Sequence, residues 1–87
     1  MTGTLLGMAR FLLQHHHQAS ECGVVFTAFK GHDSPLRHRP TIASCLSGGH
    51  AIWWMVEVDS EQAALTLLPD FVAERTTATR INQVAIP

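Results

Sequence analysis

Two segments of the chain alternate in character with the period of a β-strand, and this alternation limits what the chain can fold into. In residues 9–17 and 50–58, every second residue falls on the same side of an extended chain. One side of each strand is apolar over most of its length, through Phe11, Leu13, Ile52, Trp54 and Val56. Such strands belong to a sheet that packs one face under other elements.

Helical patterns separate the strands. The first is expected to begin at an N-cap, Ser20, and to end at a left-handed cap, Gly31. The second begins with a capping box between Asp59 and Gln62, and Pro69 kinks or splits it because proline cannot continue a helix.

Two further strands complete the pattern. Residues 41–46 are joined to residues 50–58 by a glycine-containing turn, and residues 79–86 form a more polar strand suited to a sheet edge. The order strand–helix–strand–strand–helix–strand predicts an α+β domain of the ferredoxin-like βαββαβ type, with an antiparallel sheet in the order 4-1-3-2. We expect one such domain over residues 8–87, preceded by a flexible extension at residues 1–7.

Composition excludes several classes of protein. The 87 residues carry a net charge of −1, so the basic excess of a nucleic-acid-binding protein is missing. Two cysteines cannot build the disulfide framework of a small secreted domain, and no stretch approaches the ~20 apolar residues of a membrane span. These features favour a cytoplasmic protein without nucleic-acid or membrane partners.

The expected topology gathers most of the histidines and both cysteines at one end of the sheet. The first and second strands end there, and the third strand and the first helix begin there. The gathered residues are His15, His16, His17, Cys22, Cys45 and His50.

Side-chain direction divides this group. The face under the helices receives His15, His17 and His50, and Cys22 lies near them, whereas the open face receives His16 and Cys45. Imidazole and thiolate suit zinc, nickel or copper better than magnesium or calcium. We therefore expect a transition-metal site, nickel or zinc foremost, whose ligands are His15, His17, His50 and Cys22. The alternative is structural: the histidines simply end a strand and Cys22 is a small buried apolar residue.

The open face suggests other functions. It carries apolar side chains that a small monomer does not expose to water, which predicts a homodimer through facing sheets. The predicted interface comprises Gln14, His16, Ala43, Cys45, Trp53, Met55 and Glu57. The same face offers an enzyme a pocket for a small apolar ligand at Gln14, Trp53 and Met55, with His16 and Glu57 as catalytic base and partner. A purely structural or interaction domain is the third alternative. The Arg37-His38-Arg39 run is expected to be a solvated loop.

The element order, the length and the half-apolar open face resemble the dimeric α/β-barrel superfamily of ferredoxin-like proteins, over residues 8–87. The resemblance implies two sheets packed face to face, with a small substrate or haem held inside the barrel or between sheet and helices. The histidine-rich first strand is also similar to that of small bacterial proteins of this fold that bind nickel. No family motif matches position by position, so the resemblance assigns no catalytic residue.

Overall fold

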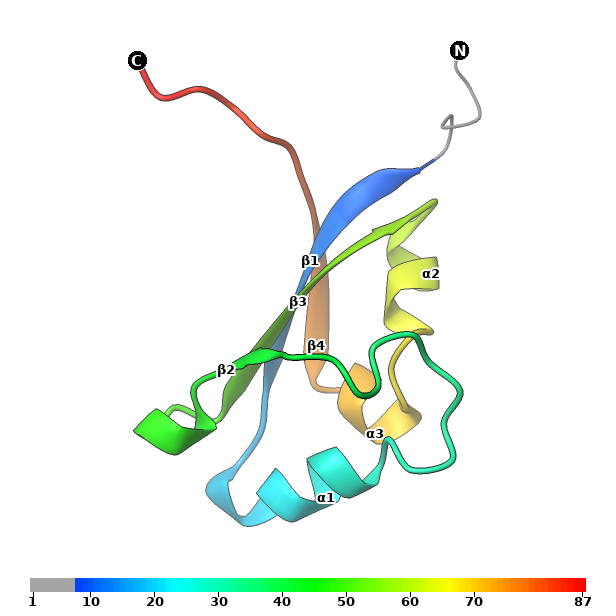
Figure 1. Ribbon diagram of the computed structural model, residues 1–87, viewed down its shortest axis with the longest axis vertical. Coiled ribbons are helices and arrows are strands. Elements are labelled where there is room, and N and C mark those ends of the chain that lie inside the picture. The colour runs from blue at the N-terminus through cyan, green and yellow to red at the C-terminus, as the bar shows by residue number, and fades with distance from the viewer. Residues whose placement is uncertain (1–7) are drawn as a thin grey trace.

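The computed structural model describes residues 8–87 of the chain, and the extension expected at residues 1–7 lies outside the described residues. The described part is an α+β domain: a four-stranded antiparallel sheet, open at both edges, with three short α-helices on one face (Figure 1). The strands are β1 (Ala9–His16), β2 (Ile42–Ala43), β3 (Ala51–Val58) and β4 (Thr76–Ile81). The helices are α1 (Cys22–Thr27), α2 (Glu61–Leu65) and α3 (Asp70–Ala73), with 3-10 turns η1 (Ala19–Glu21) and η2 (Cys45–Ser47).

The strand order is β2-β3-β1-β4, which is the predicted order 4-1-3-2 counted from the opposite edge. β1 and β3 occupy the centre and pair along their whole length, from Ala9 opposite Val58 to His16 opposite Ala51. The end of β1 therefore lies beside the start of β3, and this end of the sheet carries the candidate site.

The edge strands differ from the prediction. β2 has two residues rather than the six of 41–46, because the chain turns into η2 as soon as two ladder positions are made. β4 covers Thr76–Ile81 rather than 79–86, since it pairs with β1 from His15 opposite Thr76 to Arg10 opposite Ile81. Beyond that register the paired part of β1 has ended, so residues 82–87 extend away from the domain (Figure 1), and Val84 and Ile86 are exposed.

Two helix starts lie one or two residues from their predicted positions. Ser60, not Asp59, caps α2, and its hydroxyl accepts the Ala63 N–H at 3.0 Å. The first helical segment begins with a capping box between Gln18 and Glu21 rather than at Ser20. The prediction for Pro69 is confirmed, because it divides the second helix and precedes α3.

The core lies between the sheet and the helices. β1 and β3 alternate buried residues with exposed or half-buried ones, as the sequence pattern predicts, and each helix contributes at least one buried side chain. The core residues are Phe11, Leu13, Val25, Ile52, Trp54, Val56, Ala64, Leu68 and Val72. Complete burial of an aliphatic side chain such as Leu13 contributes about 1.5–3 kcal/mol to stability.

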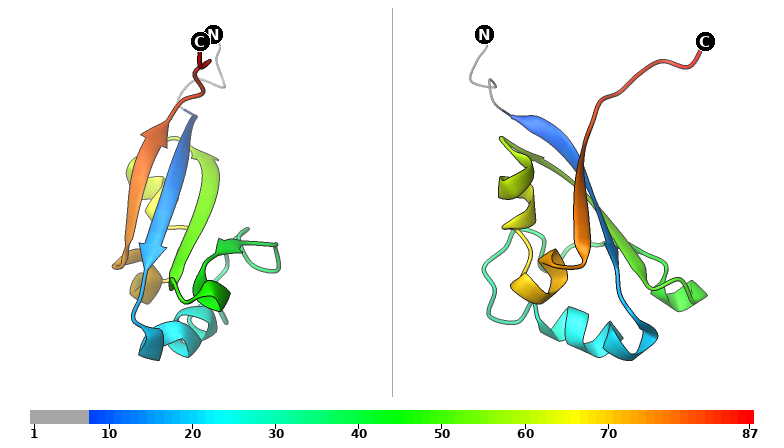
Figure 2. Two further views of the ribbon diagram at one scale, coloured as in Figure 1. Left: turned by 90° about the vertical axis from the view of Figure 1, so that its left-hand side faces the viewer. Right: turned by 180° about the vertical axis from the view of Figure 1, so that it is seen from behind.

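The other face of the sheet is uncovered (Figure 2, left). In the pairing register, Trp53 lies opposite both Gln14 and Ile42, so Ile42 and not Ala43 shares this face with Trp53. Met55 is 60% exposed there and Ile42 is 72% exposed. Within residues 8–87, no helix has the length and apolar character that crossing a bilayer requires.

Candidate metal centre

Four metal-ligating side chains come together where β1 ends and β3 begins. They are His17, Cys22, Cys45 and His50, and one ligand atom from each lies within 4.8 Å of all the others. His17 is 8% exposed, and the other three are partly buried. The site is therefore a partly enclosed pocket of two imidazoles and two thiols.

The four side chains come from two segments of the chain, each of which supplies one histidine and one cysteine. The segment from the end of β1 to the first residue of α1 supplies His17 and Cys22, and the segment between β2 and β3 supplies Cys45 and His50. In each loop four residues separate the histidine from the cysteine, in opposite order. The His17 N–H donates to the His50 carbonyl at 3.1 Å, so one backbone hydrogen bond holds the two loops together.

Ser44 and two glycines shape the second loop. The Ser44 carbonyl accepts the Gly49 N–H at 2.8 Å, and its hydroxyl accepts the Ala51 N–H at 3.1 Å. A β-carbon at Gly49 would collide with the Ser44 side chain, and Gly48 adopts the left-handed φ of 85°. Glycine is therefore favoured at Gly48 by its backbone conformation and at Gly49 by the close approach of Ser44.

His50 itself has a left-handed backbone, with φ of 53°. For a residue with a side chain this conformation costs about 1–2 kcal/mol. It turns the imidazole toward the first loop, where Nδ1 lies 3.2 Å from the Cys22 sulfur. Backbone strain of this kind is characteristic of functional sites.

The contacts between nitrogen and sulfur are short and convergent. His17 Nε2 lies 3.3 Å from Cys22 Sγ and 3.6 Å from Cys45 Sγ. A single nitrogen therefore faces both sulfurs, and Cys22 Sγ faces both imidazoles. This arrangement places four electron-pair donors around one small volume.

His15, an expected ligand, is outside this group. Its Nε2 lies 3.0 Å from Nδ1 of His17, whereas the Nε2 atom of His17 faces the sulfurs. Because the two nitrogens of one imidazole point in different directions, an ion bound at His17 Nε2 is on the far side of the ring from His15. The group of converging side chains therefore differs from the expected ligand set, because it contains Cys45 and does not contain His15.

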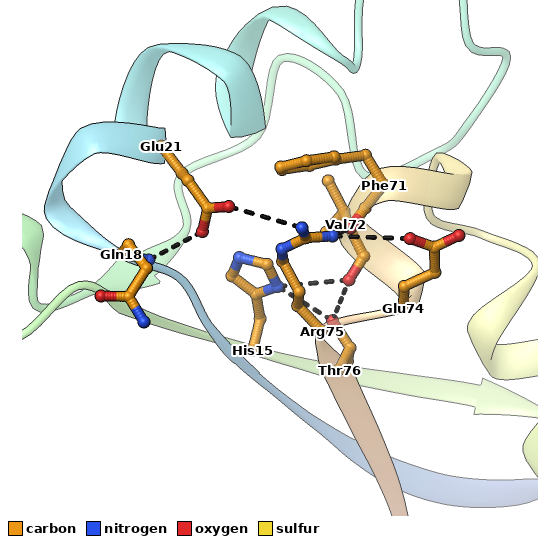
Figure 3. A network of polar contacts seen from close by, with 8 residues as sticks. All are labelled: His15, Gln18, Glu21, Phe71, Val72, Glu74, Arg75 and Thr76. Carbon is orange, nitrogen blue, oxygen red and sulfur yellow. Dashed lines mark hydrogen bonds and ion pairs between the residues drawn. The ribbon is translucent and has the colours of Figure 1, made fainter.

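The hydrogen bonds behind His15 assign its protons (Figure 3). The Thr76 hydroxyl donates to the Val72 carbonyl at 2.7 Å, so the hydroxyl proton is not available to His15. His15 Nδ1 lies 3.0 Å from that hydroxyl oxygen and 3.3 Å from the same carbonyl, both of which can only accept. Nδ1 of His15 therefore carries the proton, and its Nε2 is an acceptor.

The protonation of His15 determines which ring nitrogen of His17 carries its proton. Since His15 Nε2 accepts, His17 Nδ1 must donate to it, and a neutral His17 then has its lone pair on Nε2. That lone pair points at Cys22 and Cys45. A chain of hydrogen bonds from β4 thus presents His17 in the tautomer that a metal ion requires.

A second polar network ties the first loop to α3 and β4 (Figure 3). Arg75 donates to the Phe71 carbonyl at 2.9 Å and to Glu21 at 3.4 Å, and its guanidinium lies 3.7 Å from the Phe71 ring centroid. Glu21 in turn accepts the Gln18 N–H at 2.9 Å. The Gln18 N–H, followed by Arg75, lowers the pKa of the Glu21 carboxyl, so Glu21 stays charged beside the guanidinium.

Burial and neighbouring groups shift the pKa values of His15, His17 and Cys45 in the direction that favours their uncharged forms. Burial lowers the pKa of His15 below 6.5, and nearby His17 acts in the same direction. Burial followed by His50 lowers the pKa of His17. Burial, together with the Cys22 thiol, raises the pKa of Cys45 above 9.0. Neutral imidazoles are ready to bind a metal, whereas the thiols bind it only by releasing their protons.

Cys45 lies at the predicted end of the sheet, but its side chain faces the cluster and not the open face. A strand over residues 41–46 would point Cys45 away from His17. Because β2 ends at Ala43, Cys45 begins η2 and its side chain turns toward the cluster. The signal that identifies it in the sequence is the matched spacing of His17 with Cys22 and of Cys45 with His50.

The residues expected to form an enzyme site are not brought together. His16 lies opposite Ala51 at one end of the β1–β3 ladder, whereas Glu57 lies opposite Arg10 near the other end. The Glu57 carboxylate pairs with the Arg10 guanidinium at 3.2 Å. Gln14, Trp53 and Met55 share the uncovered face, where Gln14 and Trp53 are partly buried and Met55 is exposed.

No protein family, curated protein or solved structure that was compared with this chain matches it. The geometry of the four ligands is therefore the evidence on which a function rests.

The lowered histidine pKa values predict how the stability of the metal-free protein depends on pH. Below the unfolded value of 6.5, the unfolded chain binds protons that the folded protein does not bind at His15 and His17. The stability that these residues contribute is complete above that pH and is lost as the pH falls through their folded pKa. We expect chelator-treated protein to have a lower Tm near pH 5.5 than near pH 7.5.

Circular dichroism melts of three proteins test this dependence. The double variant His15→Gln/His17→Gln should show a smaller difference in Tm between the two pH values than the unmodified protein. His38→Gln is the control, because His38 is exposed and should leave the difference unchanged. If the double variant showed the same difference in Tm as the unmodified protein, the pH dependence could not come from His15 and His17.

Proposed function

We propose that this domain binds one zinc ion through His17 Nε2, Cys22 Sγ, Cys45 Sγ and His50 Nδ1. The observation that carries the proposal is the convergence of these four atoms within 4.8 Å. The hydrogen-bond chain that leaves the His17 lone pair facing the sulfurs supports it further.

The distances agree with a tetrahedral zinc site. With Zn–S of about 2.3 Å and Zn–N of about 2.0–2.1 Å, a bound sulfur and a bound nitrogen are about 3.5 Å apart. The three observed contacts are 3.2, 3.3 and 3.6 Å. The widest separation, 4.8 Å, exceeds the longest edge of such a tetrahedron by about 1 Å, which small rotations of the side chains can close.

The ligand set favours zinc over the other candidates. Two thiolates and two imidazoles in tetrahedral geometry are typical of zinc, whereas nickel(II) and copper(II) favour square-planar or tetragonal sites. Magnesium and calcium require oxygen ligands, which this cluster does not offer. The two neighbouring free thiols also support the cytoplasm, where cysteines stay reduced, as the compartment.

Four protein ligands also favour a structural role. A catalytic zinc ion keeps one position open for water, whereas a site with four protein ligands is closed. The ion would join the loops on either side of the β1–β3 junction, in a domain of 87 residues that has a small core. We infer a metal-stabilised binding or interaction domain rather than a zinc hydrolase.

Metal titration of two adjacent histidine variants tests the ligand assignment. Cobalt(II), followed by its visible d–d bands and by thiolate charge transfer, should saturate at one ion per chain, and zinc should displace it. His17→Ala should lose this binding, whereas His16→Ala should retain it because His16 is exposed. Zinc at 100 times its Kd should raise the free energy of unfolding by about 2.7 kcal/mol. Equal binding by the two variants would refute the proposed site.

The same titration separates His15 from the ligands. His15→Leu removes the acceptor of the His17 Nδ1–H, so the protein should still bind one ion with an affinity about 10–100-fold lower. Complete loss of binding by folded His15→Leu protein would make His15 a ligand, and unchanged affinity would remove it from the site.

We also propose that the fold is ferredoxin-like and that two copies pack their uncovered sheet faces together, as in a dimeric α/β barrel. The exposure of Met55 and Ile42 beside Trp53 supports this arrangement. A stable interface needs about 800 Å² from each partner, and the uncovered sheet face is the broad apolar surface available for it.

Analytical ultracentrifugation with matched variants tests the dimer. The unmodified protein should sediment as a dimer at tens of micromolar, and Met55→Lys should sediment as a monomer because it places a charge in the interface. Val24→Lys is the control, since Val24 is 50% exposed on α1, away from the sheet face. A monomeric unmodified protein, or a dimer in all three proteins, would contradict the proposal.

A further inference from the structure

A groove of about 440 Å³ lies between α1, the loop that follows it and β3. Its lining includes none of the four proposed zinc ligands. Small-molecule sites commonly have volumes of about 300–1,000 Å³, so the groove has room for a small ligand.

Aromatic rings form much of the groove. Phe26 and Phe29 line it from α1 and the turn that follows, and Trp54 lines it from β3. The Trp54 ring is held in place between Phe29 and His15, with ring centroids 6.1 Å and 6.3 Å away. Phe26 is 52% exposed, although it is large and apolar. Phe26 therefore offers most of the accessible ring surface on which a flat apolar group can stack, and the mostly buried Trp54 lies at the base of the groove.

Positive charges surround this aromatic surface. Lys30, Arg37 and Arg39 line the groove, and no acidic residue of the described chain does. They are half of the six basic residues in a chain of net charge −1. Within residues 8–87 none of the three forms an ion pair, whereas Arg10 and Arg75 do. The groove therefore combines an apolar surface with uncompensated positive charge.

The loop that carries the arginines is held by its own hydrogen bonds. The buried Ser34 accepts the Leu36 N–H at its hydroxyl and the Arg37 N–H at its carbonyl. The Thr41 hydroxyl donates to the Arg39 carbonyl at 3.1 Å. Between the arginines, His38 adopts the left-handed φ of 63°, a strained conformation for a residue with a side chain. His38 and Arg39 are exposed, as expected of a solvated loop, and these hydrogen bonds give the loop a defined conformation.

We propose that this groove binds a small aromatic acid: a flat ring system that bears a carboxylate, sulfonate or phosphate group. The ring would stack against Trp54 and Phe26, and the anion would lie between Arg37 and Arg39. Guanidinium groups bind such anions through paired hydrogen bonds, which makes arginine well suited to this role. A nucleic acid is disfavoured because only three basic residues line the groove and the chain as a whole has a net charge of −1. The proposal is independent of the zinc site.

Titration with 8-anilinonaphthalene-1-sulfonate tests the proposal, because this probe has both an aromatic body and an anionic group. Folded protein should bind it at a single saturable site, with energy transfer from tryptophan and an affinity that falls as salt is added. Arg37→Gln/Arg39→Gln should bind it at least about tenfold more weakly, by loss of charge-assisted hydrogen bonds. The control is Arg80→Gln, whose position lies outside the groove and which should bind like the unmodified protein.

Three results would each overturn the proposal. The first is equal affinity in the Arg37→Gln/Arg39→Gln and unmodified proteins, since the probe would then bind elsewhere, such as on the uncovered sheet. The second is equally tight binding of uncharged N-phenyl-1-naphthylamine. The third is displacement of the probe by oligothymidylate, which would indicate a single-stranded nucleic acid as the ligand. Circular dichroism spectra that match between the variants confirm that each comparison is made on folded protein.

Discussion

The pairing of β1 with β3 is the interaction on which the rest of this structure depends. Its register sets His16 opposite Ala51, so the chain leaves β1 at the place where it enters β3. The ladder is continued by one more bond, from the His17 N–H to the His50 carbonyl. That bond joins the two loops that hold the cysteines. A register shift of a single residue would turn His15 and His17 to the uncovered face and remove the cluster.

The His17–Cys22–Cys45–His50 cluster is oriented by hydrogen bonds that begin outside it. The Val72 carbonyl and the Thr76 hydroxyl fix the proton of His15, and His15 fixes that of His17. Each ring nitrogen of His15 and His17 has a hydrogen-bond partner, so burial of these two imidazoles does not leave their polar atoms unpaired. The arrangement links the junction of α3 and β4 to His17, the residue that follows β1, and it gives the buried His15 a role in orienting a proposed ligand.

Much of this arrangement could be predicted from the sequence. Period-two alternation placed His15 and His17 on the covered face, and the element order brought Cys22 and His50 to the same end of the sheet. These predictions hold because apolar periodicity determines which face of a strand is buried. The distinction between His15 and His17 could not be made in this way, because it depends on which ring nitrogen faces the sulfurs.

The remaining differences arise from tertiary contacts. Residues 41–46 have a strand-like composition, yet only Ile42 and Ala43 find ladder partners before the turn that holds Cys45. Residues 82–87 contain Val84 and Ile86, but the register of β4 against β1 leaves them without a neighbouring strand. Local propensity carries no information about where a partner strand ends.

X-ray absorption at the zinc edge, on protein loaded with one equivalent of zinc, tests the central claim most directly. Zinc bound at the proposed site should have four ligands, with two sulfur atoms at about 2.3 Å and two nitrogen atoms at about 2.0–2.1 Å. A first shell of nitrogen and oxygen alone, or six-coordinate zinc, would show that the two cysteines do not bind the ion and would contradict the account.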